Sequence, residues 1–247
     1  MTNRRKVTYP PSNTLKFVAK DLWIVDGPLI HFGALKMPFP TRMTIVRIAE
    51  EDLFIHSPTP LTFPLRREIE QIGQPRWIIA PNRIHYWWVP DWRESYPDAE
   101  VYLAPRVREQ AADRITFDGL PLDRSSGYPW DADLATLPIS GSYMTEVEFF
   151  HYRTRTLILT DLIENFELRK LDSFVVRWLT WLAKVQDPDG QMPRDMRLTF
   201  LRQRSHLRAS VEAMIEWNPE RVIVAHGRWY DRAGADELRR AFRWLLN

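Results

Sequence analysis

Three residues that could bind a metal ion or move a proton each follow an apolar segment of strand-like composition. They are His85, shortly after RWIIA, Asp161, directly after TLILT, and His226, directly after RVIVA. Side chains at strand ends converge, because the sheet holds the backbone that carries them. Imidazole and carboxylate groups ligate zinc or iron, and a histidine beside an aspartate can act as a general base. The sequence therefore predicts His85, Asp161 and His226 as metal ligands, with Asp161 and His226 as catalytic residues.

Each of these residues also has a structural interpretation when it is taken alone. A single histidine near a strand end is often a core or surface residue, and an aspartate after a strand often caps a helix. Leu162–Glu164 could form the first turn of such a helix. The same placement occurs three times, however, and this recurrence favours a common site.

The segment around His85, PNRIHYWW, is rich in aromatic residues that could contact a ligand. Binding pockets are mostly apolar and contain a few polar groups, so we predict substrate contacts from Asn82, Tyr86, Trp87 and Trp88. The alternative is that the three rings only fill space, with their polar tips bonded to neighbours.

Other candidate residues have simpler interpretations. His56 and Ser57 are adjacent at a strand end, where neighbouring side chains point to opposite faces, so they do not predict a catalytic dyad. The pair is read as a turn stopped by a proline, although an inward-pointing His56 could join Asp161 and His226. His31, His151 and His206 are interpreted as core or surface histidines, and the loop 187–195 as a candidate lid.

Composition limits the available chemistry. The chain has 247 residues and no cysteine, which excludes disulfides, thiolate ligands and cysteine nucleophiles. Its net charge is +2, and the basic residues are interspersed with acids, so nothing indicates nucleic-acid binding. No segment is long and apolar enough for a signal peptide or a membrane span, and we expect a cytoplasmic protein without membrane association.

The order of elements predicts one α/β domain over residues 1–247, with residues 1–15 as a flexible segment. Short strands come first, a strand–helix alternation follows, and then come a hairpin, helices, one late strand and a last helix. The expected strands are 21–25, 43–48, 53–56, 76–80, 100–103, 146–152, 156–160 and 221–225. The expected helices are 65–72, 173–185, 204–217 and 233–246.

These segments, taken in order, resemble the metallo-β-lactamase superfamily. PNRIHYWW stands where that family has its HxHxDH motif, and PISGSYMTEVEFF stands at its Gly-His segment. LILTD and VIVAHG resemble the strands that end in its bridging Asp and its last His ligand. The resemblance implies a four-layer αββα sandwich.

The departures from the family pattern decide how many metal ligands remain. With Asn82 in the first motif position, the other ligand positions fall on Ile84, Tyr86 and Trp87. With His85 in the second His position, they fall on Arg83, Trp87 and Trp88. The Gly-His position carries Ser142. Only Asp161 and His226 match in both registers, and His85 matches in one.

The ligand count argues against a dinuclear hydrolase, because three ligands hold at most one ion. The leading hypothesis is a hydrolase acting on a small-molecule ester, lactone or thioester, with one zinc or iron ion or with none. The alternative is a non-catalytic binding or scaffold protein that has lost metal and activity. The oligomeric state stays open, since the C-terminal segment 240–246 could pack on a partner subunit or on its own core.

Overall fold

The computed structural model describes residues 8–32, 37–49, 51–171 and 173–247, and its strands form two sheets. The first sheet has seven strands in chain order: β1 (Lys16–Ala19), β2 (Leu22–Phe32), β3 (Met37–Ile48), β4 (Asp52–His56), β5 (Gln74–Ala80), β6 (Glu100–Leu103) and β7 (Leu120–Pro121). β1 to β4 pair antiparallel, and β4 to β7 pair parallel. The meander and the strand–helix alternation expected from the sequence thus share one sheet.

The second sheet has the order β11-β10-β9-β8. It contains β8 (Leu134–Ser140), β9 (Thr145–His151), β10 (Thr156–Ile158) and β11 (Arg221–Ile223). β9 and β10 form the expected hairpin, and β11 joins β10 in parallel, so the ends of β10 and β11 lie side by side.

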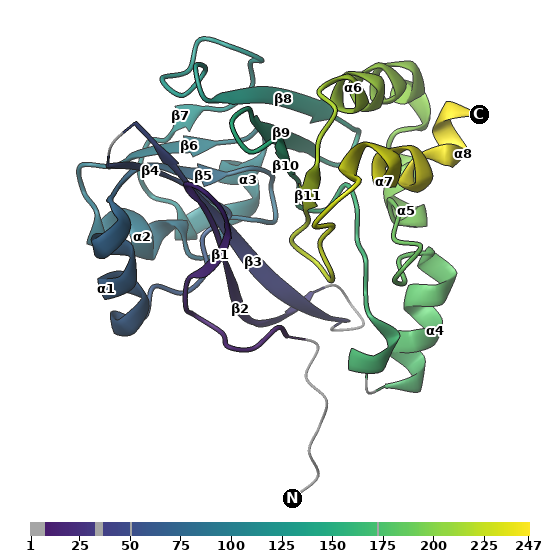
Figure 1. Cartoon of the computed structure of the whole chain (residues 1–247), viewed down its shortest axis with the longest axis horizontal. Coiled ribbons are helices and arrows are strands. Elements are labelled where there is room, and N and C mark those ends of the chain that lie inside the picture. The colour runs from purple at the N-terminus through teal and green to yellow at the C-terminus, as the bar shows by residue number, and fades with distance from the viewer. Residues whose placement is uncertain (1–7, 33–36, 50, 172) are drawn as a thin grey trace, which may run out of the picture.

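Helices flank the two sheets on their outer sides (Figure 1). Beside the first sheet lie α1 (Phe63–Ile72), α2 (Val89–Ser95) and α3 (Val107–Ala111) with the 3-10 turn η1 (Ala112–Arg114). Beside the second lie α6 (Arg204–Glu216), α7 (Gly234–Ala241) and α8 (Arg243–Leu246). Along the chain, β10 is followed by η2 (Leu168–Lys170), α4 (Phe174–Ala183), α5 (Arg194–Thr199) and η3 (Leu201–Gln203), which lead to α6. The expected αββα layering is confirmed.

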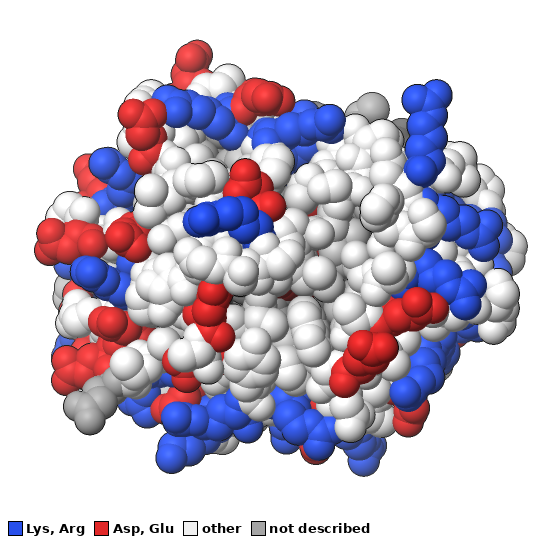
Figure 2. Space-filling model, turned by 90° about the horizontal axis from the view of Figure 1, so that it is seen from above, with Lys and Arg blue, Asp and Glu red and all other residues white. Residues whose placement is uncertain are grey.

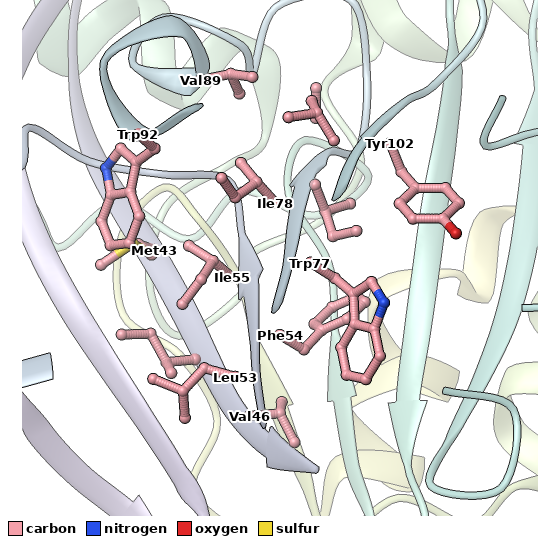
Figure 3. Close-up of a cluster of buried hydrophobic side chains, with 14 of the residues drawn as sticks. Met43, Val46, Leu53, Phe54, Ile55, Trp77, Ile78, Val89, Trp92 and Tyr102 are labelled. Carbon is pink, nitrogen blue, oxygen red and sulfur yellow. The ribbon is translucent and has the colours of Figure 1, made fainter. Parts of the chain in front are cut away.

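The alternation of side chains along β4 and β5 builds two apolar layers. Phe54 and Trp77 point to the space between the sheets, where Phe54 meets Trp130 and Phe149 edge to face at 5.0 Å. Ile55 and Ile78 point the other way, toward α2 (Figure 3). Both faces of this sheet are therefore buried, which explains its continuously apolar strands.

The end of the N-terminal segment is hydrogen-bonded to α1 and β2. Thr14 Oγ1 and the Leu15 amide donate to the Glu68 carboxylate on α1 at 2.7–2.8 Å. The Asn13 amide donates to the Asp26 carbonyl at 2.9 Å. Residues 13–15 are thus bonded to β2 and α1, residues 1–7 lie outside the described residues, and the flexibility expected for residues 1–15 stays a prediction.

Charged side chains are mixed by sign on the surface. Figure 2 shows the face seen from above, where Lys and Arg alternate with Asp and Glu around an uncharged centre. A continuous basic stripe is absent from this face, in line with the small net charge.

Candidate metal centre

The structure brings His85, Asp161 and His226 together. His226 Nε2 lies 3.0 Å from Asp161 Oδ1, and His85 Nε2 lies 3.3 Å from Asp161 Oδ2. The two Nε2 atoms are 3.3 Å apart. All three side chains are buried, and they form the one possible metal-binding group of His, Asp and Glu found among the described residues.

The hydrogen bond of His226 Nδ1 to the Pro40 carbonyl determines which ring nitrogen carries the proton. Nδ1 lies 2.7 Å from the Pro40 carbonyl oxygen, and because a carbonyl can only accept, Nδ1 must donate. In the neutral ring, Nε2 then has a lone pair that faces the Asp161 carboxylate. Two acceptors at 3.0 Å repel each other unless a proton or a cation lies between them.

His85 is held in a similar way by Ser57. Its Nδ1 lies 2.7 Å from Ser57 Oγ, a hydroxyl that can either donate or accept. When Ser57 accepts, Nε2 of the neutral ring is free to ligate. Burial lowers the pKa of His85, but the Asp161 carboxylate raises it by more than burial lowers it, so the pKa lies above its usual value. Ser57 is thus a hydrogen-bond partner of a candidate ligand. The sequence, in which Ser57 was interpreted as a turn residue, did not predict this role.

Asp161 is ionised by its surroundings. Burial alone would raise its pKa, but the positive charge of protonated His85, and a hydrogen bond from His226 when its Nε2 also carries a proton, lower it below its usual range. The site therefore combines a carboxylate with two imidazoles, which is a donor set that fits zinc or iron(II).

Asn82 holds the loop of His85 against Asp161. Its Nδ2 donates to Asp161 Oδ2 at 2.6 Å and to Thr160 Oγ1 at 2.9 Å. Its Oδ1 accepts from the amides of Ile84 and His85 at 2.9 and 3.1 Å. The fully buried Asn82 thus bonds to two of the candidate ligand residues, and its predicted substrate contact stays a prediction.

Glu146 of β9 holds the segment that follows β10. Its Oε1 accepts from the amides of Thr160, Asp161 and Leu162 at 2.7, 2.9 and 3.2 Å. Burial and the nearby Asp161 charge raise the pKa of Glu146. The next residue on the same strand face, Glu148, is also buried, and burial with the Glu146 charge raises its pKa well above the usual range.

Arg42 of β3 holds the segment that carries His226. Its guanidinium pairs with Asp26 at 2.7 Å and donates to the carbonyls of Val224 and Gly227 at 2.6 and 2.9 Å. The Arg42 side chain is 2% exposed and that of Asp26 4%. One buried ion pair therefore joins the first sheet to the metal centre.

Gly227 allows the chain to turn sharply after His226. Its φ is +99°, and a Cβ placed there would overlap the carbonyl of Asn165. We expect Gly227→Ala to lower the free energy of unfolding by at least about 2 kcal/mol, from backbone strain and this clash. Urea unfolding followed by circular dichroism measures the loss.

Gly127 offers a matched control for that substitution. Its φ of +89° is also left-handed, but a Cβ there would meet only the Arg124 side chain, at 3.4 Å or more. Gly127→Ala should therefore cost clearly less. Equal losses in the two variants would contradict the role given to the close approach at Gly227.

The metal centre opens into a cavity of about 760 Å³. His85, Asp161 and His226 line one end of it. The remaining lining is mostly apolar and comes from the β2–β3 hairpin, α4 and α5, including Met37, Phe39, Leu179, Leu182, Val185 and Met196. Pro193, Arg194 and Asp195 also line the cavity, which places part of the 187–195 loop, the candidate lid, at its wall.

Glu164 is a polar residue of the cavity that the sequence interpretation did not assign to the site. It lines the cavity with Asp161 and His226 and is 9% exposed. Burial raises its pKa to about 8, although the charge of His226 acts in the opposite direction. A carboxyl group with this pKa is protonated at neutral pH and can donate a hydrogen bond.

The three aromatic residues after His85 lie elsewhere. Tyr86 donates from its hydroxyl to the Gln110 carbonyl at 3.3 Å and stacks on Trp87. Trp88 packs against the core of the first sheet. None of the three is among the residues described as lining the cavity, to which this loop contributes Ile84 and His85. Their predicted substrate contacts stay a prediction.

The remaining histidines are separate from the centre. His31 lies in β2, His151 in β9 and His206 in α6, as interpreted from the sequence. His56 is buried and packs edge to face on Phe149 at 5.6 Å, and its Nε2 has no partner among the described residues. It does not form a dyad with Ser57, which bonds to His85.

His56 should make the fold sensitive to acid. Burial, with a smaller effect of the His85 charge, lowers the pKa of His56 from 6.5 to about 3. Between pH 6.5 and 3, His56 is therefore protonated in the unfolded chain and neutral in the folded chain. Titration of His56 leaves the free energy of unfolding unchanged above pH 6.5. Below that, it lowers the free energy of unfolding by about 1.4 kcal/mol per pH unit as pH drops toward 3.

The test compares wild type with His56→Leu in urea titrations from pH 7 to pH 4. The wild type should lose more stability over this range than the variant, which lacks the titrating ring. Parallel losses in the two proteins would show that His56 does not carry this proton linkage.

Comparison with known proteins identifies the family and the fold. The family described as "Domain of unknown function (DUF4336)" matches residues 20–197. A search of curated proteins gave no match. Solved structures that match include the DIM-1 metallo-β-lactamase, with a TM-score of 0.62 and 12% identity over 95% of this chain and 98% of that one.

Two further solved structures extend the comparison. FIM-1 from Pseudomonas aeruginosa, a metallo-β-lactamase in its mono-zinc form, matches at TM-score 0.57 and 13% identity, over 96% of this chain and 99% of that one. The flavodiiron core of Flv1 from Synechocystis sp. PCC6803 matches at TM-score 0.62 and 12% identity, over 94% of this chain and 60% of that one. The chain belongs to the family described as Domain of unknown function (DUF4336), and its fold is that of the metallo-β-lactamases.

Proposed function

We propose that this protein is a hydrolase that uses one metal ion to cleave a small-molecule ester, lactone or thioester with an apolar portion. The observation that carries the proposal is the convergence of His85 Nε2, His226 Nε2 and the Asp161 carboxylate at one end of a mostly apolar cavity. The metallo-β-lactamase fold supports it, because FIM-1 is described in a mono-zinc form.

The distances between the donor atoms fit a single small cation. Zinc ligands lie about 2.0–2.1 Å from the ion, so tetrahedral geometry separates two of them by about 3.4 Å. The two Nε2 atoms are 3.3 Å apart, and each lies near a different Asp161 oxygen: His226 Nε2 is 3.0 Å from Oδ1, and His85 Nε2 is 3.3 Å from Oδ2. Three protein ligands would leave one position open, which is typical of a catalytic site. A divalent cation held there would supply Lewis acidity, activating water and polarising a carbonyl group.

The surrounding residues have separate roles in this proposal. Pro40 and Ser57 hold the outer nitrogens of His226 and His85, which keeps both Nε2 atoms aimed at the site. Asn82 orients Asp161. The apolar wall binds the apolar part of a substrate and excludes water around the scissile bond.

In this proposal, Glu164 acts as the general acid in the cavity. Its protonated carboxyl could donate to the leaving oxygen or sulfur of a bound substrate. We expect Glu164→Gln, which keeps a hydrogen-bond donor but no transferable proton, to lower kcat about 100-fold with unchanged metal content. Steady-state kinetics and elemental analysis measure the two effects.

Asp195 provides the control for Glu164. It also lines the cavity but is exposed. Asp195→Asn should keep kcat within a few-fold of wild type. A Glu164→Gln enzyme with wild-type kcat would remove Glu164 from the mechanism without affecting the proposed ligands.

A non-catalytic binding protein is the second candidate, and one observation favours it. In either register of the HxHxDH comparison, family ligand positions fall on aromatic residues, and Tyr86 and Trp88 pack into the core of the first sheet. A protein of this kind would use the cavity for binding alone. Its affinity for a small apolar ligand would be independent of metal.

The test of the proposed function is hydrolysis before and after metal removal. Purified protein is treated with a chelator and reconstituted with zinc, iron(II) or manganese. It is then assayed against a panel of esters, lactones and thioesters with short and long acyl chains. The proposal expects activity that is lost with the metal and regained with one of the ions. Activity that survives chelation, or a panel without turnover by any reconstituted form, contradicts it.

A further inference from the structure

Helix α4 carries its apolar side chains outward, against the usual pattern of a surface helix. Phe174, Trp178 and Trp181 are 82%, 51% and 63% exposed. The one buried residue of the helix is polar: Thr180, whose hydroxyl donates to backbone carbonyls of the same helix. A helix of a globular protein normally buries its apolar stripe, so an exposed stripe indicates a surface that meets an apolar phase or partner.

Exposed apolar side chains lie on α4 and on α5 and η3, which follow it in the chain. Phe174, Trp178 and Trp181 follow the spacing i, i+4, i+7, which places them on one side of the helix. Val175 and Leu182, 59% and 42% exposed, widen that face. Leu198 and Leu201, on the neighbouring α5 and η3, are 66% and 65% exposed. These seven residues are called the α4 face below.

Basic residues without partners accompany the α4 face. Lys184 follows α4 directly, Arg194 begins α5, and Arg202 lies in η3. All three are exposed, and none of their side chains has a hydrogen bond or an ion pair among the described residues. Two acids of the segment between α4 and α5 are engaged elsewhere: Asp187 lies beside Arg228, and Asp189 is bound by arginines of α7 and α8. Asp195 on α5 is exposed and bonds only to the Met196 amide among the described residues, so three cations and one acid on this side of the molecule have no ion pair.

The α4 face continues into the cavity of the metal centre. Leu182 belongs to both, since it is exposed and also lines the cavity, and Arg194 lies at the same wall. α4 lies at the lower right edge of the molecule, away from the helices that cover the first sheet (Figure 1). An apolar molecule held at this face would have a short path into the cavity.

We propose that the α4 face docks on the surface of an anionic lipid bilayer. Tryptophan and phenylalanine with flanking Lys and Arg are the composition of interfacial helices, whose aromatic rings enter the headgroup region while the cations meet anionic lipid. A second copy of this chain fits less well, because a two-fold interface would bring the same unpaired cations together. No helix in the described part of the chain is long and apolar enough to cross a membrane, so the contact is peripheral.

The test is co-sedimentation of the full chain with vesicles, which requires neither metal nor substrate. One set contains phosphatidylcholine with 30% phosphatidylglycerol as the chosen probe, and the other contains phosphatidylcholine alone. The wild type should bind the anionic set more tightly, and binding should weaken as salt increases. Absence of binding to the anionic vesicles overturns the proposal.

Substitutions test whether the α4 face is the surface that contacts the vesicles. Trp178→Ser with Trp181→Ser should weaken vesicle binding at least about tenfold, since less apolar area is buried. Lys184→Glu with Arg202→Glu should weaken binding to the anionic set by about fivefold or more for each site. Phe63→Ser, which removes an aromatic ring that is 75% exposed on α1, is the matched control and should bind as wild type does.

The outcomes separate a bilayer from a protein partner. All substituted residues are exposed, and thermal unfolding checks that the variants remain folded. Light scattering after size exclusion reports the oligomeric state. A dimer that the tryptophan variants dissociate, without vesicle binding by the wild type, assigns the α4 face to a second copy and overturns the proposal. Equal vesicle binding by the wild type and the tryptophan variants also overturns it.

Discussion

His226→Ala is expected to lower the affinity of the protein for zinc at least about 100-fold and to abolish metal-dependent hydrolysis. Residues that only orient a ligand contribute about 10- to 100-fold to metal affinity, so loss of a ligand should cost at least as much. Only His85 and Asp161 would remain, and two ligands do not hold zinc tightly. Titration calorimetry of the metal-free protein measures the affinity.

His206→Ala is the control for this substitution. His206 is an exposed histidine of α6, outside the candidate metal group. The variant should bind zinc as wild type does, which excludes a general effect of losing one imidazole. A His226→Ala protein with wild-type zinc affinity would show that any bound ion lies elsewhere.

Arg42→Met is expected to lower the free energy of unfolding by about 2–4 kcal/mol. Removing one partner of a buried ion pair is strongly destabilising, because the remaining charge loses compensation. Among the described residues, Asp26 would keep only Lys16, 2.7 Å away and 23% exposed, and the Val224 and Gly227 carbonyls that Arg42 binds would lose their donor. Urea unfolding measures the loss. Because these carbonyls flank His226, the folded fraction should also bind zinc more weakly.

Arg47→Met gives the comparison for Arg42. Arg47 lies on the same strand and pairs with Asp21, but its side chain is 33% exposed. Exposed pairs contribute about 0–1 kcal/mol, so this variant should lose much less stability. Similar losses at the two positions would contradict the claim that the Arg42 network fastens the first sheet to the metal centre.

The sequence predicted the sheet strands and the long helices well, because their apolar periodicity is strong. Thr156–Ile158 and Arg221–Ile223 lie within expected strands, and α6 begins at the expected Arg204. The seven-residue strand β8 was missed, and β2 and β3 extend well beyond the expected 21–25 and 43–48. Two short elements were also missed: β1 pairs at the sheet edge with an exposed Phe17, and the five-residue α3 is too short for a helical pattern. Such elements form through tertiary contacts, which a local pattern does not contain.

The meeting of His85, Asp161 and His226 was predictable from their common position after strands. The other groups that surround these three side chains were not predictable from the sequence. The Pro40 carbonyl that fixes His226 is a backbone atom, which no residue type reveals. Glu164, three residues after Asp161, looked like part of a helical turn, and only its place in the cavity shows its potential role.

Asn82 illustrates how sequence comparison and structure complement each other. In one register it occupies a family ligand position, where an amide cannot replace an imidazole. The structure gives it a different task, since it bonds to the Asp161 carboxylate and to the His85 amide at once. Asn82 thus links two of the candidate ligand residues.

The central claim is that His85, Asp161 and His226 hold one metal ion. The most direct measurement is elemental analysis of the purified, reconstituted wild type beside a variant that lacks all three side chains. The account predicts close to one equivalent of zinc, iron or manganese in the wild type and none in the variant. Less than about 0.1 equivalent in the wild type after reconstitution, or equal metal in both proteins, would contradict it.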